Sequence, residues 1–442
     1  MRPLKSLTLD ALIKLLQPTF RAVADGRVAE QCRYELADTL RSGLAMMVFQ
    51  PPSLLQLQRA MVKKRQRGHW QTIFGVQEIP SDPQMRDSLD GVEVAALRGL
   101  FPQLWEKGRR AGWSRRFPTT LPRGKHQGTY DTLAVEGSEY FRSTQVQGSP
   151  CLRQPDHKGR VQYSHLIVGA TLVRAGSHQV LPLDVEEVRN VTAESTPQDC
   201  ELTAAKRLLA RVRREHPQMA QIVIGDDLYS PVPLVEQRHP QRQHSVVVAK
   251  PTSHPTLMAA VVVAEGTAPR QTGPWTAGSG AQQQNFTSPF ARQVPLTLES
   301  AGRVTYLEGW ERSSTGELLD HKSWITDLDV DATHGPVVVQ IGRTRWKIAN
   351  EQFHVHKTHG SELTHTYGHG QQTLSRVCYL LNLLAYVTPV ILALGDQLSQ
   401  RCRAQDSHRE LGNAVRTLVN RRLVESWPQL LACSLDDAEA SP

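Results

Sequence analysis

The stretch from Arg345 to Gly370 constrains the fold more than any other part of this 442-residue chain. It holds a Trp and five His within 26 positions and runs directly into a long apolar segment. Read as a helix, it places Ile348, Gln352 and Val355 on one side, because residues three and four positions apart share a helical face. We therefore expect this side of the helix to pack on the core.

The apolar segment that follows extends from Val377 to Gly395. Its 19 residues are just long enough to span a bilayer as a helix. Asn382, Thr388 and Pro389 within the segment, and the lack of a second segment of this kind, favour a buried core helix. Pro389 is expected to kink or divide that helix, because proline lacks the backbone donor.

Composition indicates a soluble, basic protein. The chain has a formal net charge of +8, which favours a polyanionic partner. No apolar run near the N-terminus is typical of a signal peptide, so we expect a cytoplasmic protein that does not act at a membrane. Six scattered cysteines form no Cys-x-x-Cys pair, which predicts neither a zinc site nor a disulfide framework.

Residues 1–120 are predicted to form a helical, basic domain for DNA binding or dimerisation. Ser81 or Asp82 followed by Pro83 is a signal for the start of a helix. At the other end of the chain, residues 401–422 are predicted to be an exposed helix and residues 431–442 a frayed tail.

A basic cluster precedes Trp70 in the N-terminal region. It contains Lys63, Lys64 and Arg65. A solvated surface is the ordinary explanation of such a cluster, but a cluster beside an aromatic residue is also a candidate for contact with DNA phosphates.

Residues 121–235 are predicted to form the first part of an α/β core. The run from Leu133 to Phe141 reads as a strand that carries Glu136 near its far end. His165–Gly176 and His178–Val188 read as a hairpin. A helix capped by Thr196 and Pro197 is expected to follow and to end near His216.

A short strand at Ile222–Ile224 ends in Gly225, Asp226 and Asp227. A carboxylate just past the end of a central strand is placed where open α/β sheets carry functional groups. A turn-forming pair of aspartates is the alternative.

Residues 236–342 are predicted to be an inserted, mostly β subdomain, with a Gly-, Gln- and Pro-rich loop at residues 273–288. Residues 343–430 would complete the core. The runs interpreted as strands of the insertion are residues 245–249, 260–264, 304–307 and 337–341.

Several motifs, in order over roughly residues 79–395, resemble those of DDE transposases of bacterial insertion sequences. Gly225–Ser230 resembles the family's Gly-Asp-x-Leu-Tyr-Ser segment, and Arg345–Phe353 resembles Arg-Trp-x-Ile-x-Asn-Glu-x-Phe. A Lys and a Gly-His-Gly follow, as in the family. Ile79–Asp90 resembles the N-terminal region of one subgroup.

The resemblance implies a ribonuclease-H-like α/β core, interrupted by the β-rich insertion and preceded by the helical domain. It implies a catalytic triad of Glu136, Asp226 and Glu351 that holds Mg²⁺, for which Mn²⁺ can substitute. Two such ions would activate the attacking oxygen and stabilise the leaving oxygen during DNA cleavage and strand transfer. Arg345, Lys347 and Lys357 would then contact phosphates.

The expected partner is double-stranded DNA, both the terminal inverted repeats of the element and its target. The protein would form a homodimer on that DNA, in the cytoplasm and in association with the bacterial nucleoid.

Two positions depart from the family pattern. Glu136 stands where the family has Asp, and Ala349 stands where it has a Glu directly after the Ile. Positions 349 and 351 point about 200° apart on a helix, so only one of them can face a shared metal site. Glu351 is the predicted ligand, because it is the only acid between Asp331 and Glu362. A catalytically impaired, DNA-binding relic is the alternative.

The histidines of this stretch lack a paired Cys or Glu, so no dedicated zinc site is predicted from their spacing. His365 and His369 match positions of the family, and a core or supporting role is expected for both. The five histidines are His354, His356, His359, His365 and His369.

Overall fold

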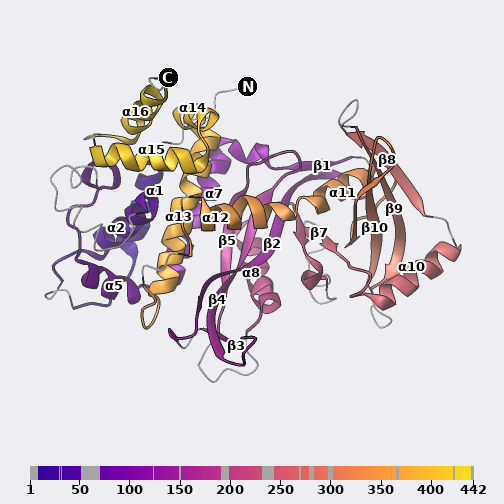
Figure 1. Cartoon of the computed structure of the whole chain (residues 1–442), viewed down its shortest axis with the longest axis horizontal. Coiled ribbons are helices and arrows are strands. Elements are labelled where there is room, and N and C mark those ends of the chain that lie inside the picture. Colours follow the sequence, from indigo (N-terminus) through magenta and orange to yellow (C-terminus); the bar gives the residue numbers. More distant parts are fainter. Residues whose placement is uncertain are drawn as a thin grey trace.

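The computed structural model shows a mixed α/β protein. It describes residues 8–28, 30, 32–50, 70–122, 124–148, 151–190, 199–230, 243–267, 270–277, 283–296, 302–359, 361–364, 368–421 and 424–439. Figure 1 shows a helical region at one end, a sheet in the middle and a β-rich region at the other end.

The described N-terminal region is helical up to residue 116, as predicted. Ser81 is the N-cap of α5, where it forms a capping box with Gln84. The basic cluster at Lys63, Lys64 and Arg65 lies outside the described residues. The helices are α1 (Leu9–Ala22), α2 (Leu36–Phe49), α5 (Asp82–Asp90), α6 (Val94–Arg98) and α7 (Leu100–Ala111).

Five strands form the centre of the sheet. They are β2 (Gly128–Ser143), β4 (Val161–Val173), β5 (Leu181–Val188), β6 (Gln221–Gly225) and β7 (Gln243–Val248). Their spatial order is β5-β4-β2-β6-β7. The first three are antiparallel neighbours, whereas β2, β6 and β7 run parallel. Two short strands, β1 (Thr119–Leu121) and β3 (Leu152–Pro155), pair with β2 and β4.

The β-rich region continues this same sheet. β11 (Leu318–Thr326) pairs with β7, and β10 (Arg303–Ser313), β9 (Gln284–Pro295) and β8 (Gln271–Ala277) follow outward. β7 therefore belongs to the central sheet although it lies after residue 236.

Three local predictions for residues 236–342 were wrong. Residues 260–264 lie in α10 (Pro255–Thr267) and residues 337–341 in α11 (His334–Arg343). The predicted loop at residues 273–288 lies largely in β8 and β9. Short β-branched runs occur in helices as well as in strands, so periodicity does not separate the two.

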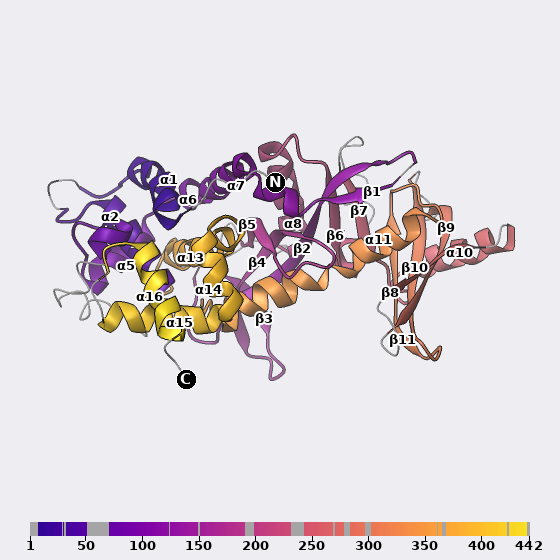
Figure 2. The same cartoon turned by 90° about the horizontal axis from the view of Figure 1, so that it is seen from above.

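Helices cover both faces of the central sheet. α8 (Glu201–Glu215) lies against β4 and β5 on one face. Its predicted caps at Thr196 and Pro197 lie outside the described residues, and Cys200 is the N-cap. On the other face, η6 (Ile348–His354) crosses β2 and β4, and α12 (Val355–Thr358) continues from it. Figure 2 shows these segments leading back from α11 toward the C-terminal helices.

α13 (Leu374–Gly395) is the predicted apolar core helix. It packs against α2 and α5, and Pro389 lies within it without dividing it. It is the one helix of the described chain that is long and apolar enough to cross a membrane. However, 83% of its most apolar 18-residue stretch is buried, which is typical of a core helix in a soluble protein.

Three further helices complete the C-terminal part. They are α14 (Gln397–Gln405), α15 (His408–Arg421) and α16 (Trp427–Glu439). The exposed helix predicted for residues 401–422 is thus two helices. The prediction of a frayed tail over residues 431–442 was wrong, because α16 covers most of it and buries Leu431 and Leu435.

Candidate functional site

Glu136 lies on β2, the central strand, and points toward the face covered by η6. Its strand partner is Gly169, and a Cβ at Gly169 would lie 2.9 Å from Phe353 of η6. Arg345 Nη1 donates to Glu136 Oε2 at 3.0 Å. Burial raises the pKa of Glu136, and the charge of Arg345 opposes that rise.

Asp226 directly follows β6, the parallel neighbour of β2. Because Ala134 pairs with Ile224, residue 226 lies level with Glu136. Asp226 caps a short helical turn, where its Oδ1 accepts from the backbone N–H of Leu228 at 3.0 Å. Its negative charge contributes to the raised pKa of Glu136, so the two carboxylates are electrostatic neighbours.

The carboxylate of Asp227 is occupied by contacts within the protein. Its Oδ1 accepts from the backbone N–H of Lys250 at 2.9 Å and lies 3.0 Å from Nε2 of His254. Asp226 is therefore the better candidate of the two, as the sequence motif predicts.

Glu201 is a third carboxylate that sequence reasoning missed. It is the first residue of α8, and its negative charge also contributes to the raised pKa of Glu136. A Cβ at Gly137 would lie 2.3 Å from Glu201 Cδ, so a side chain there would displace the Glu201 carboxylate. A Glu in the first turn of the predicted helix and a Gly directly after Glu136 were the available signals.

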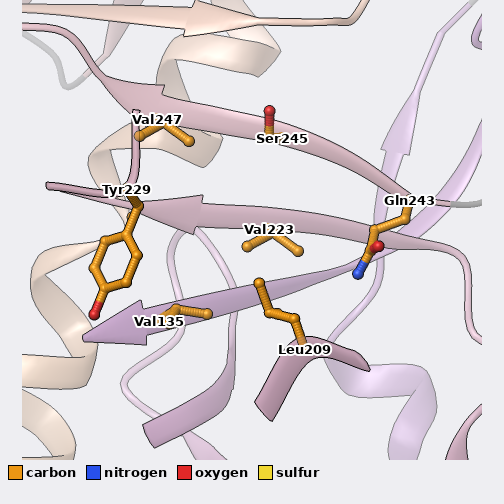
Figure 3. Close-up of a pocket in the computed structure, with 8 residues that line it drawn as sticks. Val135, Leu209, Val223, Tyr229, Gln243, Ser245 and Val247 are labelled. Atoms are coloured by element: carbon orange, nitrogen blue, oxygen red, sulfur yellow. The ribbon is translucent and has the colours of Figure 1, made fainter. Parts of the chain in front are cut away.

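Tyr229 lies in the turn that Asp226 caps and connects this turn to Glu201. Its hydroxyl donates to Glu201 Oε1 at 2.5 Å. Burial raises the pKa of Tyr229, and the negative charges of Glu201, Asp226 and Glu136 raise it further. Figure 3 shows the ring extending from the end of β6 toward β2, beside the apolar pocket that Val135 helps to line.

The helix that begins near Arg345 presents two flanks to different parts of the protein. One flank faces the acids, because Arg345 bonds Glu136. The other faces the turn between β4 and β5, where Lys347 Nζ donates to the carbonyl of Ser177 at 2.7 Å. The buried Ile348 lies between these flanks, near Gly169 of β4.

The rotation of residues about the helix axis decides whether position 349 or position 351 faces Glu136. Ala349 follows Arg345 by four residues, close to one turn of an α-helix or of the wider turns of η6, so it shares the flank that faces Glu136. Glu351 follows Lys347 by the same interval and shares the other flank.

The contacts of Glu351 agree with that placement. Its Oε1 lies 3.5 Å from Nδ1 of His178, and its backbone carbonyl accepts from the hydroxyl of Tyr386 at 3.0 Å. Among the described residues, no contact joins Glu351 to Glu136 or Asp226. The predicted triad is thus brought together in two of its members only, since helical phase takes the third to the opposite flank.

Glu351 instead lines a pocket between the sheet and the C-terminal helices. His178 and His359 also line it. Three arginines add positive charge to its wall: Arg116, Arg403 and Arg409.

The predicted phosphate contacts are partly occupied within the protein. Arg345 pairs with Glu136, and Lys347 is 5% exposed with its ammonium group on a backbone carbonyl. Burial lowers the pKa of Lys347 and of the half-buried Lys357. Lys347 therefore faces the protein and not a phosphate.

A second polar cluster lies farther along β4 and comprises Cys151, His165 and His369. Cys151 Sγ lies 3.7 Å from Nε2 of His165 and 3.5 Å from Nε2 of His369. The two Nε2 atoms are 2.9 Å apart. Within the described residues, this is the one set of three His, Cys, Asp or Glu side chains whose ligand atoms all lie within 4.8 Å of one another.

Of the other histidines, the rings of His354 and His359 are neighbours at 5.0 Å, and His356 bonds Asn382. His365 lies outside the described residues.

No protein-family model matches the chain, and no curated protein matches it either.

Proposed function

We propose that the chain is a DNA-binding protein of the DDE-transposase type whose acid site has lost one of its three metal ligands. The observation that carries this proposal is the phase of the helix after Arg345. Ala349 occupies the flank that faces Glu136, whereas Glu351 occupies the other flank.

The arrangement of the sheet supports a ribonuclease-H-like core. Three antiparallel strands, a helix and two parallel strands in the order β5-β4-β2-β6-β7 are typical of such cores. The acids lie where that arrangement brings functional groups together, on the central strand and just past the end of its parallel neighbour.

The remaining acids fit Mg²⁺ in kind, because Mg²⁺ takes hard oxygen ligands and needs only one or two carboxylates. Glu136 and Asp226 would hold the ion, and Mn²⁺ would fit the same donors. A bound ion supplies charge stabilisation at the reacting phosphate. Arg345 now neutralises Glu136 from within the protein, so part of the charge that would attract a cation is already balanced.

A second candidate is an active enzyme in which Glu201 replaces the missing ligand. The observation in its favour is that Glu136, Asp226 and Glu201 interact electrostatically around Tyr229. Glu201 lies at the start of α8, on the face of the sheet opposite to η6, so it would complete the site from a different direction.

The expected partner is duplex DNA from the ends of the mobile element. The net charge of +8 and the arginine-lined pocket beside Glu351 are suited to a phosphate backbone. Assembly as a homodimer on that DNA, in the cytoplasm and on the nucleoid, belongs to the same proposal.

The test is a nicking and binding assay on duplexes taken from both sides of the gene, with Mg²⁺ or Mn²⁺. The wild-type chain should bind DNA with a strong dependence on salt and should not cut it. Glu136→Asp together with Ala349→Glu should produce metal-dependent nicking, because the pair restores the family's ligands.

Three outcomes separate the candidates. Nicking by the wild-type chain that Glu201→Gln abolishes would establish the second candidate in place of the first. Binding without any nicking in the double variant would mean that more than the two ligands has been lost. Absence of salt-dependent DNA binding would overturn both candidates.

A further inference from the structure

Three segments that are far apart in the chain meet at the Cys–His cluster of Cys151, His165 and His369. Cys151 directly precedes β3, His165 lies on β4, and His369 lies just before α13. Cys151 and His165 are 0% and 1% exposed, whereas His369 is half-buried. The cluster therefore opens toward solvent on the side of His369.

We propose that the Cys–His cluster is a binding site for Zn²⁺ or a divalent transition metal of similar size. The ligands are Cys151 Sγ and the Nε2 atoms of His165 and His369, and a water molecule or an external ligand takes the fourth position on the open side. This proposal does not depend on the proposed DNA chemistry.

The distances suit a tetrahedral ion. Zinc binds thiolate at about 2.3 Å and imidazole at about 2.0–2.1 Å, which separates S and N by about 3.6 Å in a tetrahedron. The two S···N distances are 3.7 and 3.5 Å. The two nitrogens are 2.9 Å apart and would separate to about 3.4 Å around the ion.

The neighbours on the far side of each ring fit the same site. His369 Nδ1 lies 3.1 Å from the carbonyl oxygen of Gly370, which can only accept, so Nδ1 carries a proton. His165 Nδ1 lies 3.5 Å from a carboxylate oxygen of Glu187 and forms no hydrogen bond within the described part of the chain. The two Nε2 atoms face each other at 2.9 Å, a distance at which at most one proton fits between them.

Two ring nitrogens at this distance need a shared proton or a cation between them. The thiol sulfur of Cys151 points at the same spot, which adds a third electron-pair donor. Metal-bound histidines commonly donate their other N–H to a carboxylate or a backbone carbonyl, and a carboxylate oxygen of Glu187 and the carbonyl oxygen of Gly370 lie 3.5 and 3.1 Å from the two Nδ1 atoms here.

The surroundings protect such a site. Tyr140 stacks on His165 at 5.5 Å, and Phe141 lies 5.1 Å from His369. The same burial argues against a nucleophilic role for Cys151, because a fully buried thiol offers no approach to a substrate.

A bound ion would tie the β3–β4 edge to the segment that starts α13. That segment is already held from the other side, because Asp90 of α5 accepts from the backbone N–H groups of Gln371, Gln372 and Leu374. The ion would thus connect the sheet to the helical region at a defined point.

The experiment uses the full chain after removal of metal with a chelator. Co²⁺ is added, the thiolate-to-cobalt charge-transfer band is recorded, and Zn²⁺ or Mg²⁺ is then added as a competitor. We expect one Co²⁺ per chain, a band that Zn²⁺ removes, and no effect of Mg²⁺.

The variants identify the ligands. Cys151→Ser should abolish the band, and His369→Ala should lower the affinity for Zn²⁺ by at least about tenfold. Cys433→Ser and His354→Ala are matched controls outside the cluster and should leave both unchanged. Circular dichroism checks folding, and His369→Ala decides the matter if Cys151→Ser does not fold.

The proposal is overturned if the metal-free chain gives no cobalt band, in which case a proton and not a metal relieves the facing nitrogens. A band that survives Cys151→Ser, or a Zn²⁺ affinity that His369→Ala leaves unchanged, would overturn it equally.

Discussion

The acid cluster of Glu136, Asp226 and Glu201 has one member on β2, and the Cys–His cluster has one member on its antiparallel neighbour β4, but the charges of the two clusters are balanced differently. In the acid cluster, Arg345 lies 3.0 Å from Glu136 and supplies a positive charge from within the protein. In the Cys–His cluster, the donor atoms of His165 and His369 face each other, and the nearby Arg376 lies by Glu187 instead, at 3.6 Å. Among the described residues, no Arg or Lys pairs with the donor atoms of the Cys–His cluster, so this cluster is the better pre-organised metal site.

The largest expected effect is therefore the stabilisation of the folded chain by a metal ion that binds at the Cys–His cluster. A ligand that binds only the folded state at 1,000 times its dissociation constant adds about 4 kcal/mol to the free energy of unfolding. We expect Zn²⁺ to raise the unfolding midpoint of the metal-free chain accordingly, as measured by denaturant titration. Mg²⁺ should have no comparable effect, and Cys151→Ser should remove the response to Zn²⁺. An equal response to both ions would remove the contrast between the clusters.

The second prediction concerns His356, a buried histidine with a single neutral partner. Its Nε2 donates to Asn382 Oδ1 at 2.7 Å, and Asn382 is held in turn by the carbonyl of Ser361. Burial lowers the pKa of His356 to about 4. The unfolded chain therefore binds the proton more readily, so stability is complete above pH 6.5 and is lost as the pH falls toward 4.

The free energy of unfolding should fall by about 3 kcal/mol, which follows from the lowering of the pKa from 6.5 to about 4. It is measured as the difference between the wild-type chain and His356→Gln in denaturant titrations from pH 7 to pH 4. The exposed His354 provides the control, because His354→Gln should retain the wild-type dependence on pH. A parallel dependence in wild-type and His356→Gln chains would show that His356 does not control it.

Local patterns predicted much of the sheet, because they follow from adjacent residues. The hairpin at residues 165–188 and the strand before Asp226 form as predicted, and so does the core helix α13. The exchange of strands for helices at α10 and α11 shows the limit of this reasoning, since both segments contain short apolar runs whose periodicity fits either structure.

The sites were harder to predict, because they depend on contacts between distant segments. Glu201 reaches the acid cluster from a helix 65 positions after Glu136. The partners in the Cys–His cluster are 14 and 204 positions apart, which no local motif encodes. The spacing of the cysteines and histidines therefore did not indicate that Cys151 and His369 lie together.

The third prediction tests the internal cation of the acid cluster. Arg345→Gln should lower the free energy of unfolding at pH 7 by about 1 kcal/mol, since the pair is half-buried, with side chains 28% and 23% exposed. The loss should shrink on acidification, because protonated Glu136 no longer needs a counter-charge. Arg142→Gln breaks a more exposed pair with Glu139 and should cost less. A larger loss for Arg142→Gln would mean that Arg345 does not balance Glu136.

The smallest effect is expected at Glu351, the acid that the sequence analysis predicts as the third ligand. Its partner His178 has a side chain that is 93% exposed, and such surface pairs contribute about 0–1 kcal/mol. Glu351→Gln should therefore leave stability unchanged within error. In the Glu136→Asp, Ala349→Glu background it should also leave metal-dependent nicking unchanged, because the carboxylate lies on the flank of Lys347 and not on that of Arg345. Asp226→Gln in the same background serves as the positive control and should abolish nicking. If Glu351→Gln abolishes nicking as well, the helix must turn when DNA binds, and the acid cluster would then have its third ligand after all.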